Sequence, residues 1–191
     1  QLYEGLPIGD EGNVGLITYM RTDSVKLSKE SQDSARKYIV KKYGAQFTPS
    51  VPNAYKSKKS AQEAHEAIRP ALPLREPESM EKYLTPDQYK LYTLIWNRFI
   101  SSQMTPAVFN VVSVEIKAGR CIFKANGSQK VFQGFTAVYE VSEEENEEER
   151  VLPPLDAGEA LDLIKLNPNQ HFTKPPPRYS DASLVKALEE D

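Results

Sequence analysis

The sequence predicts an α+β fold, in which a mostly helical part comes first and antiparallel strands follow. Helical periodicity and capping residues dominate up to about residue 104, and alternation of apolar and polar residues takes over after Pro106. A proline-rich run at 174–177, KPPP, then separates the strands from one more helix start. The 191 residues suffice for one full domain or two small ones.

The first elements expected along the chain are a strand and a helix. Residues 16–20, LITYM, form an apolar, β-prone run that a polar turn follows, which predicts a short buried strand. Ser28 then precedes a helical stretch from Lys29 to about Lys42. Gly44 is suited to end that helix, because glycine readily adopts the backbone geometry of a helix C-terminus.

A second helix is expected over 60–69. Ser60 and Glu63 have the spacing of a capping box, in which two side chains satisfy free backbone donors. The helix must end near Arg69, because Pro70 disfavours helical geometry in the residue before it.

A third helix is expected after an irregular, proline-rich crossing. Thr85 and Pro86 form a clear helix start, with proline at the first helical position, and the helical pattern runs to about Gln103. A wide apolar stripe along it is typical of core packing and consists of Tyr92, Ile95, Trp96, Phe99 and Ile100.

The second half of the chain is expected to be antiparallel. Asn126-Gly127 is suited to a tight hairpin turn, and Ser180 to the cap of a last helix. Four segments alternate as strands do: 109–118, 120–127, 130–141 and 159–172.

Composition excludes several classes of protein. No run of even 12 apolar residues occurs, so the sequence predicts no membrane span, and it shows no basic-then-apolar leader. A single cysteine, Cys121, allows neither an internal disulfide nor a multi-cysteine zinc site. We therefore expect a reducing, cytoplasmic setting.

The net charge says little about partners, because one segment dominates it. The total is −3, but residues 142–149 hold six Glu, without which the balance would be +3. Such a run is typical of a solvated loop. The chain begins at Gln1 without a methionine and stops at Asp191 within a helical pattern, so we expect a piece of a larger protein.

Tyr19 and Arg21 form the first pair suited to chemistry. In an extended backbone, residues i and i+2 point to the same face, so these two side chains would project together. Arginine offers a planar clamp for phosphate oxygens, and tyrosine can serve as a covalent nucleophile. On spacing alone, a half-buried strand position remains the alternative for Tyr19.

His65 is the second candidate. On a helix, Gln62, His65, Glu66 and Arg69 would share one face, and an imidazole beside a guanidinium suits a phosphate-bearing group. Asp23 could orient that imidazole by accepting its N–H. A surface or capping histidine is the alternative reading.

Three segments resemble the type IA DNA topoisomerases. GLITYMRTDS at 15–24 and SAQEAHEAIRP at 60–70 resemble the two signature segments of this family, and the separation of 46 residues between Tyr19 and His65 also fits. PPPRYSDASLVKALEE at 175–190 resembles the start of the family's next domain. Met20 and EAHEAIRP resemble the bacterial topoisomerase I group more than topoisomerase III or reverse gyrase.

The resemblance implies a role for each candidate residue. Tyr19 would attack a single-stranded DNA phosphodiester and become linked to the 5′ phosphate, after which the other strand passes and the break is resealed without ATP. Arg21 would stabilise the charge that develops on the phosphate. His65 would contact DNA with Asp23 as its orienting partner, and Arg69 would contact a phosphate.

The resemblance also implies partners and a cofactor. The implied partners are single-stranded DNA and negatively supercoiled duplex DNA, with no membrane and a monomeric, nucleoid-associated protein. The implied cofactor is Mg²⁺, held by an acidic cluster in a Toprim domain. No D-x-D-x-E pattern precedes Tyr19, so we expect no metal to bind here and no activity from this chain alone.

By the same analogy, residues 1–104 would be the active-site tyrosine domain, 105–177 a β-rich arch segment and 178–191 the start of a further domain. Two other classes of function stay open. One is a non-catalytic module that binds single-stranded DNA by stacking bases on Tyr19 and His65. The other is a purely structural piece of the arch, which would leave the Tyr-x-Arg pattern unexplained.

Overall fold

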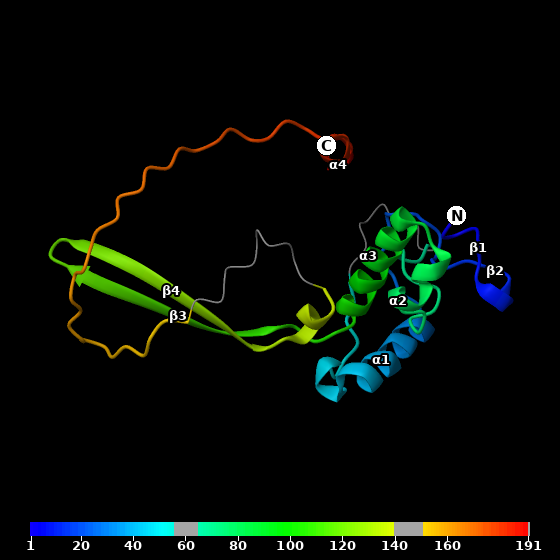
Figure 1. Ribbon diagram of the computed structural model, residues 1–191, viewed down its shortest axis with the longest axis horizontal. Coiled ribbons are helices and arrows are strands. Elements are labelled where there is room, and N and C mark those ends of the chain that lie inside the picture. The colour runs from blue at the N-terminus through cyan, green and yellow to red at the C-terminus, as the bar shows by residue number, and fades with distance from the viewer. Residues whose placement is uncertain (56–64, 140–150, 191) are drawn as a thin grey trace. The chain divides into compact units, whose positions relative to one another are not determined.

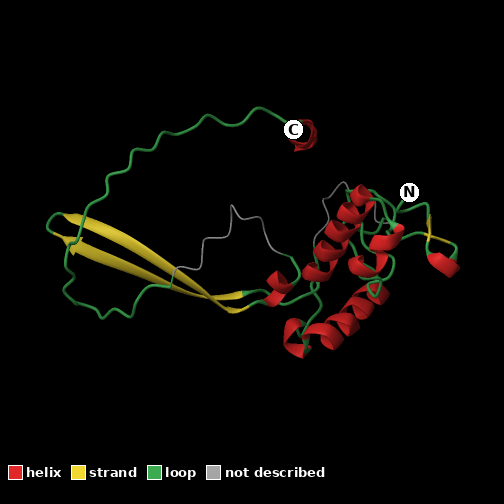
Figure 2. Ribbon diagram, in the orientation of Figure 1, coloured by secondary structure: helices red, strands yellow, loops and turns green. Residues whose placement is uncertain are grey.

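The computed structural model describes residues 1–55, 65–139 and 151–190. It divides into two units, Gln1–Pro153 and Pro154–Asp191, which are treated separately below. Helices and antiparallel strands are both present (Figure 2), so the predicted α+β class is confirmed. In the part of the chain that the structure describes, no helix combines the length and apolarity of a membrane-spanning segment.

Helix α1, Lys29–Tyr43, follows the sequence prediction closely. The Ser28 hydroxyl oxygen accepts a hydrogen bond from the Ser31 N–H at the helix start. Gly44 ends the helix at a positive φ of 104°, a backbone region that side chains with a Cβ rarely adopt. Both ends are fixed by residues next to the helix in sequence, which is why local reasoning finds them.

Helix α3, Pro86–Ser102, is also confirmed. Thr85 and Gln88 form a reciprocal capping box, with Pro86 at the first position. The shorter helix α2, Pro77–Met80, was not predicted. The core of the first unit lies largely between α1 and α3 (Figure 1), and its most buried aromatic and aliphatic residues there are Ala35, Tyr38, Ile39, Tyr92, Trp96, Phe99 and Ile100.

The predicted strand over 16–20 is replaced by a single β-bridge between Ile17 and Pro70. A short hairpin of β1, Leu6–Pro7, and β2, Asn13–Val14, lies just before it. Leu16 and Ile17 are buried, as predicted, whereas Tyr19 and Met20 are exposed. The chain leaves the core after Ile17, which brings the Tyr19 side chain to the surface.

The predicted helix over 60–69 is wrong for residues 65–69, which carry no helical turn. The capping box at 60–63 lies outside the described residues. The reason is non-local: the Ala67 N–H donates to the Lys26 carbonyl at 2.8 Å, and the Arg69 carbonyl accepts from the Thr18 N–H at 2.9 Å. Backbone groups that a helix would pair internally are thus paired with the 18–26 segment.

A long hairpin, β3 at Val108–Ala118 and β4 at Cys121–Phe132, forms the strand content of the second half of the first unit. Strand β4 merges the strand predicted over 120–127 with the beginning of the strand predicted over 130–141. The predicted turn at Asn126-Gly127 is wrong, because Asn126 pairs with Ser113 and Gly127 pairs with Val112. The turn is at Gly119-Arg120, where Gly119 has a positive φ of 58°, as the favoured two-residue hairpin turns require.

The predicted strand over 130–141 ends early. After Phe132 the chain turns at Gly134, where a side chain would collide with the Pro106 carbonyl, and forms the 3-10 helix η4, Gly134–Ala137. The acidic run at 142–149 lies outside the described residues.

The second unit holds one helix, α4, Asp181–Glu190, whose start the Ser180 hydroxyl caps by accepting from the Ser183 N–H at 3.2 Å. This cap is as predicted. The predicted strand over 159–172 is wrong, since no residue there belongs to a strand or a bridge. Ile164 is 97% exposed. Alternation alone does not make a strand, because a strand also needs a hydrogen-bonding partner, and none is described within this unit.

Candidate functional site

The predicted site residues lie on two segments, 16–28 and 65–71, that run side by side. Besides the backbone bonds given above, two hydroxyls join the segments. Thr18 donates to the Ala67 carbonyl at 2.7 Å, and Ser24 donates to the His65 carbonyl at 2.6 Å. Ser24 is nearly fully buried. Sequence reasoning missed both hydroxyls, because their partners are more than 40 residues away in the chain.

Arg21, Asp23 and His65 are brought together at the surface end of these segments. The Arg21 Nε donates to Asp23 Oδ2 at 2.7 Å, and Arg21 Nη1 lies 3.5 Å from His65 Nε2. The second contact joins two nitrogens, and the role of the imidazole nitrogen in it depends on the tautomer of the ring. The Arg21 side chain is 40% exposed, so part of the guanidinium faces solvent.

Asp23 does not bond to the imidazole as the sequence analysis expects. Its Oδ2 binds Arg21, while Asp23 Oδ1 and His65 Nδ1 are both buried without a hydrogen-bond partner. The physical reason is charge: a guanidinium is always positive, and the one two residues away along the chain forms a charge-assisted hydrogen bond with the carboxylate. Asp23 therefore fixes the arginine rather than the histidine.

Tyr19 is 53% exposed, and its ring packs edge-on against Tyr3, with 5.3 Å between centroids and 69° between planes. The Arg21 N–H donates to the Tyr19 carbonyl at 2.9 Å, so the backbone turns here and the expected extended geometry of 19–21 is wrong. Sequence reasoning missed Tyr3, and no pattern in the sequence distinguishes it from the other tyrosines.

Arg69 and Glu66 form a clamp that supports the start of α1. The Arg69 guanidinium donates to Glu66 through Nε at 2.8 Å and Nη2 at 2.9 Å, and Nη1 donates to the Pro70 carbonyl. Glu66 Oε1 also accepts the Ser28 N–H at 2.8 Å. The Arg69 side chain is only 12% exposed. Its predicted phosphate contact stays a prediction beside this structural role.

These hydrogen bonds also determine how Glu66 titrates. Burial by itself would raise the pKa of Glu66, but the bonds from the Arg69 guanidinium and from Ser28 outweigh it. The pKa of this carboxyl is therefore below its usual value. Glu66 therefore stays charged to a lower pH than a glutamate of ordinary pKa does.

The described residues do not fit a magnesium site. Over 1–55, 65–139 and 151–190, no group of three or more His, Cys, Asp or Glu side chains is placed to hold a metal ion. Asp23 already has one oxygen on Arg21 and the other buried.

Comparison with known proteins identifies the family of the chain. The model of the family described as DNA topoisomerase matches residues 1–191, so the chain belongs to this family. The resemblance predicted from the segments at 15–24 and 60–70 is thereby confirmed.

Two relatives and one solved structure make the similarity specific. The chain is 49% identical, over 197 aligned residues, to DNA topoisomerase 1 of Xylella fastidiosa strains Temecula1 and 9a5c, and spans 24% of their length. The structure of full-length topoisomerase I from Thermotoga maritima is 34% identical with a TM-score of 0.78. That match covers the whole chain and 30% of the Thermotoga chain.

Proposed function

We propose that this chain is the strand-cleaving part of a type IA DNA topoisomerase, with Tyr19 as the nucleophile. The observation that carries the proposal is the placement of an exposed Tyr19 two residues before Arg21, whose guanidinium Asp23 fixes and His65 contacts. The reaction would relax negatively supercoiled DNA without ATP.

The proposed reaction exchanges one phosphodiester for another. The Tyr19 oxygen attacks the phosphorus of a single-stranded segment, its proton leaves to solvent, and the bond from phosphorus to the 3′ oxygen breaks. The leaving 3′ oxygen takes up a proton, and the 5′ phosphate stays on Tyr19. After the other strand has passed, the 3′ hydroxyl attacks the phosphotyrosine and restores the original bond, so no external energy source is needed.

Arg21 and His65 would act on the phosphate. The bond from Asp23 to Nε holds the guanidinium in one orientation, from which it would stabilise charge on phosphate oxygens. His65 lies beside that guanidinium and would contact the same strand. Asp23 is thus proposed as the positioning residue of Arg21, in place of the role beside His65 that the sequence analysis expects.

The proposed partners are single-stranded and negatively supercoiled DNA, bound by a monomeric, nucleoid-associated protein. A second candidate function is supported by the exposed ring pair of Tyr3 and Tyr19, which offers a stacking surface for unpaired bases. In that case the chain would bind single strands without cleaving them.

One experiment separates the two functions. In a protein of the relatives' full length that contains this chain, Tyr19→Phe should keep single-strand affinity and lose all covalent adduct, since only the attacking oxygen is removed. Tyr3→Phe is the matched control and should retain adduct formation. Adducts are counted after denaturation with end-labelled DNA. A Tyr19→Phe protein that still forms covalent adducts would contradict the assignment of Tyr19 as the nucleophile.

A further inference from the structure

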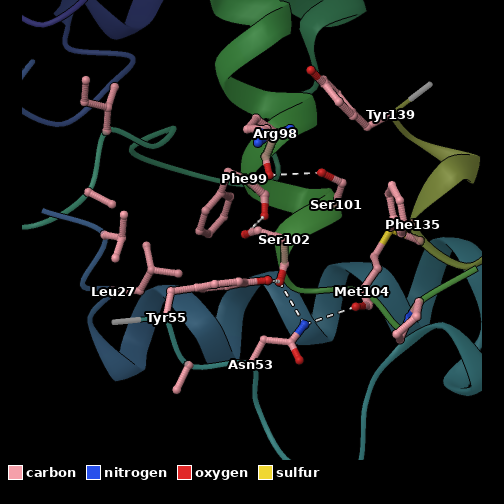
Figure 3. A pocket seen from close by; sticks show the side chains of 15 residues that line it. Leu27, Asn53, Tyr55, Arg98, Phe99, Ser101, Ser102, Met104, Phe135 and Tyr139 are labelled. Atoms are coloured by element: carbon pink, nitrogen blue, oxygen red, sulfur yellow. Dashed lines mark hydrogen bonds between the residues drawn. The ribbon is translucent and has the colours of Figure 1, made fainter. Parts of the chain in front are cut away.

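A cavity of about 600 Å³ lies beside the candidate site and is used by none of the chemistry above. Its walls come from the C-terminal end of α3, from residues 53–55 and from the two site segments, whose residues Leu27 and Ile68 line it. Figure 3 shows Tyr55 and Phe135 on opposite sides of it. The volume is within the range of small-molecule sites in proteins.

Two polar side chains of the walls, Tyr55 and Asn53, already have hydrogen-bond partners within the fold. The Tyr55 hydroxyl donates to the Ser102 carbonyl at 2.7 Å, which holds its ring in place. The Asn53 amide donates to the carbonyls of Ser102 and Met104 at 2.9 and 3.1 Å (Figure 3). With Phe99 and Phe135, the Tyr55 ring gives the cavity flat surfaces on which a planar apolar group can stack.

Among the described residues, Arg98 is the one charged residue that lines this cavity. Its guanidinium lies over the Tyr139 ring, 5.2 Å from the centroid. Within the described ranges, no carboxylate forms an ion pair with Arg98, and no acidic residue lines the cavity. The site therefore combines flat aromatic walls with one cation, which suits a ligand that has a planar ring and an anionic group.

We propose that this cavity binds one nucleotide of single-stranded DNA, with the base between the aromatic walls and the adjoining phosphate on Arg98. The choice of a DNA strand as the source of the nucleotide rests on the proposed function. Because the cavity is bordered by the segments that carry Arg21 and His65, a base held there fixes the strand at a set distance from Tyr19. The cavity thus acts as an anchor that selects which phosphodiester is cleaved.

The test is direct binding to the 191-residue chain, observed by NMR shifts of backbone amides. The probes are thymidine 5′-monophosphate, thymidine, inorganic phosphate and an eight-residue oligothymidylate. We expect saturable shifts around Tyr55, Phe99 and Phe135 with the nucleotide and tighter binding of the oligomer. Thymidine and phosphate should bind more weakly than the nucleotide, because each makes half of the contacts.

Two variants and two matched controls assign the contacts. Arg98→Gln should weaken nucleotide binding about tenfold through loss of the phosphate pair, whereas Lys82→Gln, which removes an equivalent cation over Tyr83, should not. Tyr55→Ala should weaken it about tenfold by loss of stacking. Tyr55→Phe keeps the ring but loses the hydroxyl bond to Ser102, so its nucleotide affinity should exceed that of Tyr55→Ala.

Three results would overturn the proposal. These are shifts that do not cluster around the cavity, an equal loss with Lys82→Gln and Arg98→Gln, and an oligomer that binds no more tightly than the mononucleotide. The same titration on Tyr19→Phe should be unchanged. Failure of the anchor can therefore be told apart from failure of the proposed cleavage chemistry, which this titration does not use.

Discussion

The Arg21 side chain lies between a carboxylate and an imidazole, and these two contacts use different edges of the guanidinium. Nε bonds to Asp23, and Nη1 points to His65. An arginine can make both contacts at once because its donors are fixed in one plane. A lysine has a single ammonium on a flexible stem, so it could keep the contact with Asp23 or the contact with His65 but not both in this geometry.

Arg21→Lys should therefore keep DNA binding largely intact and lower the rate of adduct formation by about tenfold or more, since positive charge remains but the oriented fork is lost. The rate is measured with a single-stranded oligonucleotide in a protein of the relatives' full length. Arg75→Lys, which alters another ion-paired arginine, is the control and should cleave normally. Equal cleavage by the Arg21 and Arg75 variants would rule out the clamp.

Ser24 is a second residue whose effect can be isolated. Ser24→Ala removes the hydroxyl that binds the His65 carbonyl at 2.6 Å and leaves that carbonyl without this partner. We expect a loss of about 1–2 kcal/mol in the free energy of unfolding. We also expect weaker single-strand binding. Ser79→Ala, which removes an exposed local bond to Glu76, should change neither quantity. Denaturant titration measures the free energy of unfolding, and fluorescence anisotropy measures the affinity for single-stranded DNA.

At the scale of elements, the site depends on pairing between the 16–28 and 65–71 segments rather than on either segment alone. Glu66 contributes by joining Arg69 to the N-terminus of α1 through Ser28. Its lowered pKa means that the folded state favours the charged carboxylate. By linkage, the stabilisation is fully present above the pKa of Glu66 in the unfolded chain and is lost as pH falls through the folded value.

Glu66→Gln should accordingly lower the free energy of unfolding by about 1 kcal/mol at pH 7. The difference from the unmodified chain should shrink as pH falls below about 4.3, the usual glutamate value, and vanish once Glu66 is protonated in the folded chain. Glu81→Gln removes an exposed glutamate on the surface as a control. A Glu66 effect that stays constant from pH 7 to the acidic limit would contradict the linkage.

Elements with local signals could be predicted from the sequence, and those with distant partners could not. The ends of α1 and α3 depend on Ser28, Gly44 and Thr85, which lie next to the helices that they cap. The 65–69 segment has a helical pattern, yet its backbone pairs with residues some 40 to 50 positions earlier. No local rule weighs that competition.

In the candidate site too, the residues could be predicted from the sequence, whereas the contacts between them could not. Tyr19, Arg21, Asp23 and His65 were named from residue type and motif, and three of them do meet in space. Their pairing was not predicted, because whether Asp23 bonds to Arg21 or to His65 depends on distances set by the two segments together. No sequence pattern predicts the cavity at Arg98, because its walls come from five separate stretches of chain.

At the scale of the whole molecule, net charge governs how strong the proposed binding to DNA is expected to be. Its net charge of −3 includes six Glu at 142–149, and the rest of the chain totals +3. Phosphate contacts supply most non-specific affinity for DNA, and each contact releases counterions, so such binding weakens steeply with salt. A chain with so small an excess of positive charge should make few of these contacts.

The 191-residue chain by itself should therefore bind single-stranded DNA weakly, with an affinity that falls as salt rises. It should neither cleave nor relax DNA, because the family resemblance implies that the Mg²⁺ site lies in a Toprim domain. Replacing the six Glu of 142–149 by Gln tests the electrostatic part. Affinity should rise at low salt, and the gain should fade as the Debye length shortens to about 3 Å near 1 M salt. Anisotropy titrations across salt measure this, with plasmid relaxation in parallel. Tight binding at physiological salt would contradict the expectation of few phosphate contacts, and a covalent adduct formed by this chain alone would contradict the expected inactivity.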